Sequence, residues 1–290
     1  MVETRNRWID GTVIAPTSPS YWKAGSMQWL QLKQLTKGIT IQGGGLIEGQ
    51  GNAWWGNAHG DETNFPRLLG AQRKGKLPSR RPTALRFYGS YNVTVSGITI
   101  QNSPQCHLKF DNCDSVRVSN ITISSPATAN TDGIHLQNSA NVEIRQSGRL
   151  HLDPNRSSMV HVQSVTCGPG HGISIGSLGE GRTAAWVSNV TVEHVAFVGT
   201  LTGFESRLGR VSHVQTPIVI NQYYSDGRSN KNQSSAVAIS QISYDTIIGT
   251  YTEQPVYLAC SDSFPCKALS ISNLDLEPEE DKYHVLAPYC

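Results

Sequence analysis

The sequence has few charged residues and no long hydrophobic run. Asp, Glu, Lys and Arg make up 16% of its 290 residues, and the formal net charge is only +2. So small a charge gives no support for nucleic-acid binding, although it allows an acidic substrate because local charge in a cleft matters more than the sum. No apolar run is long enough to cross a membrane. The hydrophobic content of 38% also excludes a disordered chain or a coiled coil.

What the sequence does contain is a repeat. A polar turn, a short alternating strand, a two-residue break and a second short strand recur at 92–100, 115–123, 141–144, 159–165 and 189–197, and more faintly at 236–242 and 268–274. Repeated short strands with inward β-branched residues predict a β-solenoid, because each coil buries its apolar face only by stacking on its neighbours. A β-sandwich is the alternative, but sandwiches do not repeat a pattern of this length. We expect residues 1–290 to form one domain.

The spacing of the repeat singles out one coil. The steps are 23, 26, 18 and 30 residues between starts at Asn92, Ser115, Asn141, Met159 and Asn189. A coil that is five or more residues short should be hard to close without distortion. The sequence therefore predicts an irregularity between 145 and 158.

Cysteines and glycosylation sequons both favour secretion. Six cysteines are present, and the pairs Cys106/Cys113 and Cys260/Cys266 close short loops, which suits local disulfides in an oxidising compartment. Five Asn-x-Ser/Thr sequons fit a secreted glycoprotein, at Asn92, Asn120, Asn155, Asn189 and Asn232. Residues 1–10 have no apolar stretch of signal-peptide type, so we expect the signal peptide to lie outside this sequence.

Two segments could carry chemistry. The first, Asn130-Thr-Asp-Gly-Ile-His135, places Asp132 beside a glycine at the start of a strand. An Asp in such a turn usually caps its own backbone. The second segment, 167–179, is more specific, because three glycines around His171 let the backbone come close to something while presenting one imidazole.

These segments resemble the polygalacturonases of glycoside hydrolase family 28, especially the plant ones. The likeness covers nearly the whole chain, and Asn-Thr-Asp and Gly-His-Gly are two of the family's four signatures; it also includes 8–16, 38–42, 49–55, 103–106 and 217–224. The resemblance implies an all-β, right-handed, single-stranded parallel β-helix of the pectin-lyase-like type. It also implies a monomeric, secreted cell-wall enzyme that hydrolyses the α-1,4-galacturonan of pectin by inversion, without a cofactor or metal.

The resemblance also assigns roles to particular residues. Asp132 would belong to the base that activates water, and His171 would hydrogen-bond and orient the carboxylate group. Asn130 would hold the strand end. Gly170 and Tyr224 would contribute to the sugar-binding site.

The other two family signatures are missing. Where Gly-Asp-Asp-Cys-Ile-Ser-Ile is expected, 148–153 read Gly-Arg-Leu-His-Leu-Asp, and where Gly-Val-Arg-Ile-Lys-Thr-Trp-Gln-Gly is expected, 203–210 read Gly-Phe-Glu-Ser-Arg-Leu-Gly-Arg. The first loss removes the general acid, a second base and the cysteine that would bond Cys167. The second removes the Arg and Lys that would hold a galacturonate carboxylate. Both replacements can be written as the expected motif translated in another frame, through misassigned exon boundaries or a decayed gene. The alternative is a pair of diverged loops.

Three functional hypotheses follow. The first is that the sequence is a damaged reading of a polygalacturonase. The second is an inactive pectin-binding or vestigial protein, because one carboxylate cannot act as both acid and base. The third is another β-helical pectinase, either a calcium-dependent lyase, for which no carboxylate cluster is visible, or a rhamnogalacturonan hydrolase. Because the chain starts well inside the β-helix of a family member, its uncapped first coil also predicts poor solubility.

Overall fold

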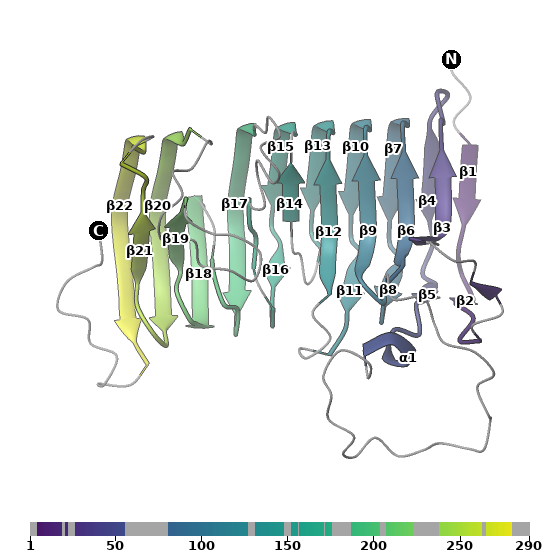
Figure 1. The fold of residues 1–290 in the computed structure, drawn as a ribbon, viewed down its shortest axis with the longest axis horizontal. Helices are drawn as coiled ribbons and strands as arrows, with labels where there is room; N and C mark the ends of the chain where they lie inside the picture. Colours follow the sequence, from purple (N-terminus) through teal and green to yellow (C-terminus); the bar gives the residue numbers. More distant parts are fainter. Residues whose placement is uncertain are drawn as a thin grey trace.

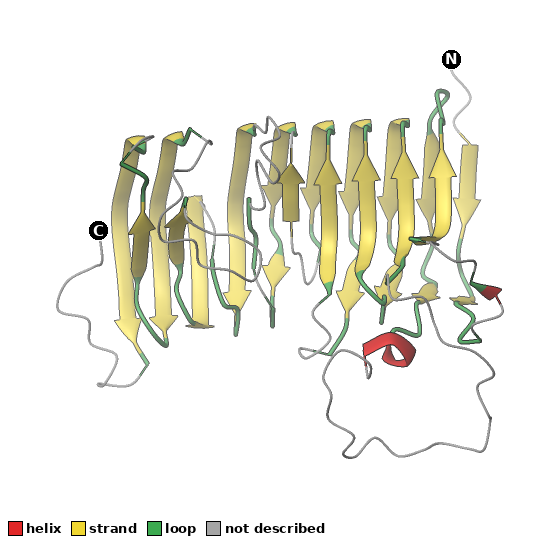
Figure 2. Cartoon of the chain, in the orientation of Figure 1, coloured by secondary structure: helices red, strands yellow, loops and turns green. Residues whose placement is uncertain are grey.

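The structure is a computed structural model, and almost all of its regular secondary structure is β-strand (Figure 2). It describes residues 5–18, 21–22, 27–55, 81–126, 131–147, 152–155, 157–170, 172–175, 187–203, 207–222, 238–262 and 265–279. Within these ranges the only α-helix is α1 (Asn52–Trp55), and no helix could span a membrane. The predicted all-β, parallel β-helix class is confirmed.

The strands form two large sheets and two small ones, and all the pairings are parallel. The main sheet runs in the order β1 (Arg5–Trp8), β4 (Ile39–Gln42), β7 (Tyr91–Ser96), β10 (Asp114–Ser119), β13 (Ala140–Arg145), β15 (Ser158–Gln163), β17 (Ser188–Val198), β18 (Arg207–Val214), β20 (Ser240–Tyr251) and β22 (Lys267–Pro278), with β16 (Thr166–Cys167) paired to β17. The front sheet comprises β3 (Gln28–Lys33), β6 (Thr83–Tyr88), β9 (Cys106–Asp111), β12 (Asp132–Gln137) and β14 (Leu152–Asn155). The small sheets are β2 (Thr12–Ile14), β5 (Leu46–Glu48), β8 (Thr99–Gln101) and β11 (Thr122–Ser124), and the pair β19 (Ile218–Asn221) and β21 (Val256–Ala259).

The chain winds through these sheets in coils. It passes from the front sheet to the main sheet and then to the small sheet, as in β6–β7–β8 and again in β9–β10–β11. The front and main sheets therefore run in opposite directions, as Figure 1 shows. Each strand stacks on its counterpart in the next coil, so that Val93, Val116 and Val142 lie in one column.

The repeat starts seen in the sequence are corners of the coils. The second residue of five successive main-sheet strands has φ between 51° and 59°, and these residues are Asn92, Ser115, Asn141, Met159 and Asn189. Asn tolerates this left-handed conformation better than most residues because its short polar side chain can bond locally. This preference explains why Asn opens three of the five repeats.

One continuous core fills the coils. Inward residues of the front sheet, such as Leu85, Leu108 and Ile134, are at most 1% exposed and stack in register. The rings of Phe87 and Phe110 stack at 5.3 Å between centroids. Each such buried side chain stabilises the fold by about 1.5–3 kcal/mol.

Two coils are much shorter than the others. Val93 pairs with Val116 and Ile247 with Leu274, which are steps of 23 and 27 residues. By contrast, Val142 pairs with Val160, a step of 18, and Val195 with Gly209, a step of 14. The first short coil is the predicted one, and the sequence did not reveal the second.

The irregularity predicted between 145 and 158 does not break the two large sheets, and 148–151 and 156 lie outside the described residues. The register of β13 on β15 and of β14 on β12 is unbroken. Twelve residues (120–131) separate β10 from β12, but only six (146–151) separate β13 from β14. The shortfall lies in this connection, because parallel backbone pairing in the large sheets is retained.

One of the two predicted disulfides is present. Cys260 and Cys266 are bonded, with their Cα atoms 5.7 Å apart. The predicted Cys106–Cys113 bond is wrong, because both residues are buried thiols. Cys106 begins β9, and this extended strand alone separates its ends by about 16 Å, which is beyond the reach of a disulfide. Cys167 also forms no disulfide, and Cys290 lies outside the described residues.

Candidate functional site

Asp132 is the first residue of β12, as predicted, and it is half-buried. Its backbone N–H donates to Gln105 O at 3.0 Å. Its carbonyl oxygen lies 2.6 Å from His107 Nδ1. The backbone of the candidate base is therefore held on both sides by residues of the preceding coil.

His107, which sequence reasoning missed, is the centre of this network. It is 1% exposed and lies in β9, opposite Gly133 in the register of β9 on β12. Its Nε2 lies 2.8 Å from Ser125 Oγ, 3.3 Å from Ser124 O and 3.4 Å from Ser103 N. The available signal was the alternation in β9, where His107 and Lys109 flank the inward Leu108.

The glycine-rich segment packs against the backbone of the next coil. A Cβ on Gly168 would lie 1.9 Å from Val198 O, and one on Gly172 would lie 2.1 Å from Thr202 O. These two glycines have φ of +121° and +89°, which side chains rarely adopt. The sequence led us to expect that the backbone comes close to something here. At Gly168 and Gly172 its close neighbour is the backbone of the next coil of the protein.

Gly170 differs from Gly168 and Gly172. Its carbonyl accepts from Leu201 N–H at 2.8 Å, but a Cβ at this position would meet nothing within 4 Å. Apart from its two chain neighbours, no described residue therefore fills the space beside Gly170.

Topology fixes the separation of Asp132 and Gly170 along the helix axis. The strand of Asp132 precedes β13, and the segment with Gly170 precedes β17. Since β15 alone lies between β13 and β17 in the main sheet, the two residues are two coils apart. At about 4.8 Å per coil, this is about 10 Å along the axis.

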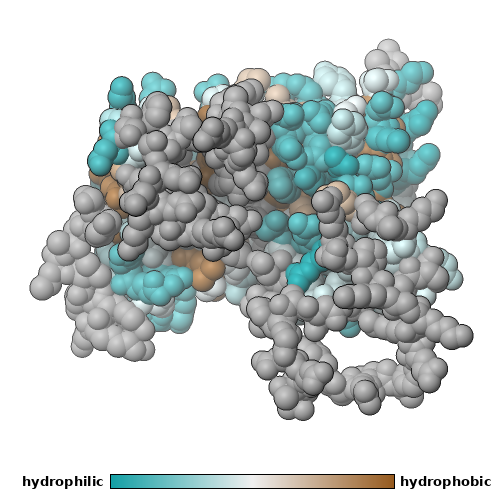
Figure 3. Space-filling model, in the orientation of Figure 1, coloured by the Kyte–Doolittle hydropathy of each residue, from teal (hydrophilic) through white to brown (hydrophobic). Residues whose placement is uncertain are grey.

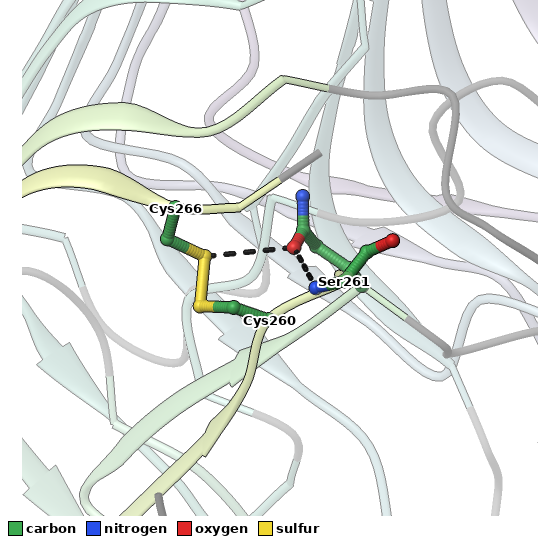
Figure 4. The surroundings of a disulfide bond; sticks show 4 residues. Cys260, Ser261 and Cys266 are labelled. Atoms are coloured by element: carbon green, nitrogen blue, oxygen red, sulfur yellow. Dashed lines mark hydrogen bonds between the residues drawn. A yellow bond between two sulfur atoms is a disulfide. The ribbon is translucent and has the colours of Figure 1, made fainter. Parts of the chain in front are cut away.

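Three of the predicted site residues, Asn130, His171 and Tyr224, lie outside the described residues. The end of β19, close before Tyr224, is well anchored. Gln222 N–H donates to Ala259 O at 2.9 Å, and its Oε1 accepts from Ser261 N–H at 2.6 Å. The same oxygen lies 3.5 Å from Cys266 Sγ, beside the disulfide (Figure 4).

The outer face of the front sheet near Asp132 is polar, as the teal surface over β6, β9 and β12 in Figure 3 shows. Arg86 and Lys109 both contact the buried carboxylate of Asp111, Lys109 at 3.5 Å. The guanidinium of Arg86 also lies 5.0 Å from the ring centre of Tyr88. Within the described ranges, no group of three or more His, Cys, Asp or Glu side chains could hold a metal.

Cys106 is paired with Asp132 in the sheet. Burial, and next the negative charge of Asp132, raise the pKa of the Cys106 thiol well above its ordinary value. The thiol therefore stays protonated at neutral pH and supplies no thiolate nucleophile.

These observations define a β-helical protein with a carboxylate on one outer face and an open glycine turn two coils away. The chain belongs to the glycosyl hydrolases family 28, whose family profile matches residues 8–286. The likeness noted in the sequence is therefore confirmed at the level of the family.

Curated relatives include plant polygalacturonases. A polygalacturonase of Cryptomeria japonica is 36% identical over 296 residues, covering 93% of this chain and 55% of the relative. Polygalacturonase-2 of Solanum lycopersicum is 33% identical, covering 94% of this chain and 62% of the relative. The chain thus spans little more than half the length of these proteins.

Solved structures share the fold. The polygalacturonase from Erwinia carotovora has a TM-score of 0.68 at 20% identity, with 94% of this chain and 80% of that chain covered. The endo-xylogalacturonan hydrolase from Aspergillus tubingensis has a TM-score of 0.70 at 20% identity, with coverage of 94% and 79%. Endopolygalacturonase I from Stereum purpureum, solved in complex with two galacturonate, has a TM-score of 0.59 at 18% identity, with coverage of 99% and 96%.

Proposed function

We propose that this chain derives from a secreted, monomeric polygalacturonase that hydrolyses the α-1,4-galacturonan of cell-wall pectin, and that the sequence as printed has lost most of its turnover. The proposal depends chiefly on the membership of family 28 together with Asp132, whose backbone is fixed at the start of β12. The galacturonate bound by the Stereum enzyme supports an acidic sugar as ligand.

Inverting hydrolysis needs two carboxyl groups about 6.5–9.5 Å apart on opposite sides of the scissile bond. Asp132 is assigned to the base that activates water, and His171 orients the carboxylate group. Asn130 holds the strand end, while Tyr224 and the open backbone at Gly170 receive the sugar. The sequence has no carboxylate at the motif position that would supply the acid. No residue is therefore assigned to protonate the leaving oxygen.

The two short coils support the view that residues have been lost from the sequence at these two places. Residues 148–153 fall in the step from Val142 to Val160, and 203–210 overlap the step from Val195 to Gly209. The two absent signatures therefore coincide with the two shortest coils among the described pairings. Sequencing of the transcript across 145–215 would distinguish a misread gene from a decayed one.

Activity is tested with a repaired chain, in which 148–153 and 203–210 are replaced by the two expected family motifs. We expect the repaired chain to release reducing ends from polygalacturonate and the printed chain to release almost none. In the repaired chain, Asp132→Asn should lower kcat by about 10²- to 10⁴-fold. Asp114→Asn, at the start of β10 in the main sheet, is the matched control and should leave kcat unchanged. Equal turnover by the printed and repaired chains would refute the proposal.

A second candidate is an inactive pectin-binding protein, which the missing acid specifically favours. Calorimetry with the printed chain would then show polygalacturonate binding without new reducing ends. A lyase would instead give an unsaturated product that absorbs in the ultraviolet. A rhamnogalacturonan hydrolase would release products only from the branched polymer.

A further inference from the structure

The contact between His107 and the carbonyl oxygen of Asp132 fixes the position of one ring proton. The carbonyl oxygen of Asp132 can only accept, so the ring Nδ1 that lies 2.6 Å from it must carry the proton. Nε2 faces both a donor and an acceptor, the N–H of Ser103 at 3.4 Å and the carbonyl oxygen of Ser124 at 3.3 Å. The proton on Nδ1 is therefore directed at the backbone carbonyl of Asp132.

The surroundings of His107 explain how the ring reaches that carbonyl. Gly133 follows Asp132 and lies opposite His107 in the sheet. No side chain of β12 therefore stands between the imidazole ring and the carbonyl of Asp132. On the other side, Ser125 Oγ lies 2.8 Å from Nε2. The ring thus ties β12 to β9 and to the turn after β11.

The turn that contains Ser103 has further hydrogen bonds besides the one to His107. Ser103 Oγ donates to Cys106 O at 2.6 Å, and the indole N–H of Trp55 donates to Pro104 O at 3.2 Å. Removing the imidazole would leave these bonds in place. The contacts that would be lost are that of Nδ1 to Asp132 O and those of Nε2 to Ser103 N–H, Ser124 O and Ser125 Oγ.

From this geometry we propose that His107 is a positioning residue, which sets the orientation of Asp132 through its backbone carbonyl. The inference depends on the proposed function only for the role of Asp132 as base. A displacement of the carboxylate by a fraction of an ångström would misplace the water that it activates. The effect should therefore appear in kcat rather than in KM.

Three substitutions of His107 separate a positioning role from simple filling of space. The amide nitrogen of Asn can occupy the place of Nδ1, whereas the amide nitrogen of Gln can occupy that of Nε2. In the repaired chain we expect His107→Gln and His107→Ala to lower kcat by about 10- to 100-fold, with KM within about threefold. His107→Asn should retain most of kcat. A Gln variant as active as the Asn variant would overturn the proposal.

A second measurement needs no activity. Amide hydrogen exchange of the printed chain reports on the N–H of Asp132, which is bonded to Gln105 O. We expect this amide to exchange about tenfold faster in the Gln and Ala variants than in the Asn variant, with amides of β20 unchanged. If the repaired chain proves inactive, the proposed function fails while this experiment still decides on His107. Equal exchange in all three variants would refute the positioning role.

Discussion

At the scale of single residues, β9 shows how neighbouring positions on one strand take on opposite roles. Leu108 and Phe110 face the core and are fully buried. His107, Lys109 and Asp111 alternate with them on the outer face. Asp111 is nevertheless only 2% exposed, because Arg86 and Lys109 cover it. The outer face near the site is thus a packed ionic layer rather than a solvated one.

Asp111→Asn should destabilise the fold markedly, because it leaves Arg86 with little solvent and no counter-charge. The side chain of Arg86 is only 19% exposed. Removing one partner of a buried pair typically costs about 3–5 kcal/mol. We expect a loss of about 2–4 kcal/mol in the free energy of unfolding, measured by urea denaturation. Glu143→Gln, which removes the solvent-accessible pairs with Arg117 and Arg145, is the control and should cost no more than about 1 kcal/mol.

The Cys113 thiol predicts a dependence of stability on alkaline pH. Burial raises its pKa from the ordinary value of 9.0 to about 11. The unfolded chain therefore ionises first, so stability is fully present below pH 9 and declines as the pH rises towards 11. The loss is about 2–3 kcal/mol by the upper end of this range. Cys113→Ala should unfold with a shallower slope between pH 9 and 11, and an identical slope would contradict the assignment.

At the scale of elements, the stacking of coils demands glycine where two backbones meet. We expect Gly172→Ala to cost about 3 kcal/mol or more, since the new methyl group would meet Thr202 O at 2.1 Å in a left-handed backbone conformation. Gly44→Ala is the control, because nothing lies within 4 Å of its Cβ position, and it should change stability by about 0.5 kcal/mol at most. Thermal and urea unfolding of both variants would measure the difference. Equal effects would show that the close contact is not what selects glycine.

The same elements show what could be predicted from the sequence. The repeat starts at Asn92 and Asn141 were visible because a left-handed corner favours a residue type. The strand start at Asp132 was visible for a similar reason, because a polar turn precedes an alternating run. The partners of His107 were not visible, because they depend on the register between coils. The Cys106–Cys113 prediction failed for a related reason, since loop length alone does not reveal that the intervening residues are extended.

At the scale of the whole molecule, the two short coils interrupt the columns of the core. Ser147 is 3% exposed, and its carbonyl accepts from Thr166 as that of Ile98 does from Thr122. It therefore occupies a place that Ile98, Ile121 and Val165 fill in other coils. Gly209 similarly lies between Val195 and Ile247 in the main sheet. Both interruptions replace a large apolar side chain by a small residue, which weakens the stacking that holds a solenoid together.

Restoring these coils should therefore stabilise the molecule independently of catalysis. In the test chain, both short steps are lengthened to the 26 residues that separate Val116 from Val142, with β-branched residues at the inward positions. We expect its free energy of unfolding to rise by about 3 kcal/mol or more. The reason is that each restored coil buries at least one additional large apolar side chain against two neighbours. Insertion of the same number of Gly and Ser residues is the control, and it should give no gain because longer loops cost only about 0.6 kcal/mol per doubling and bury nothing. Urea unfolding with intrinsic tryptophan fluorescence would measure both chains. If the two insertions changed the unfolding free energy equally, the short coils would be a tolerated variation of this helix and not the trace of lost core.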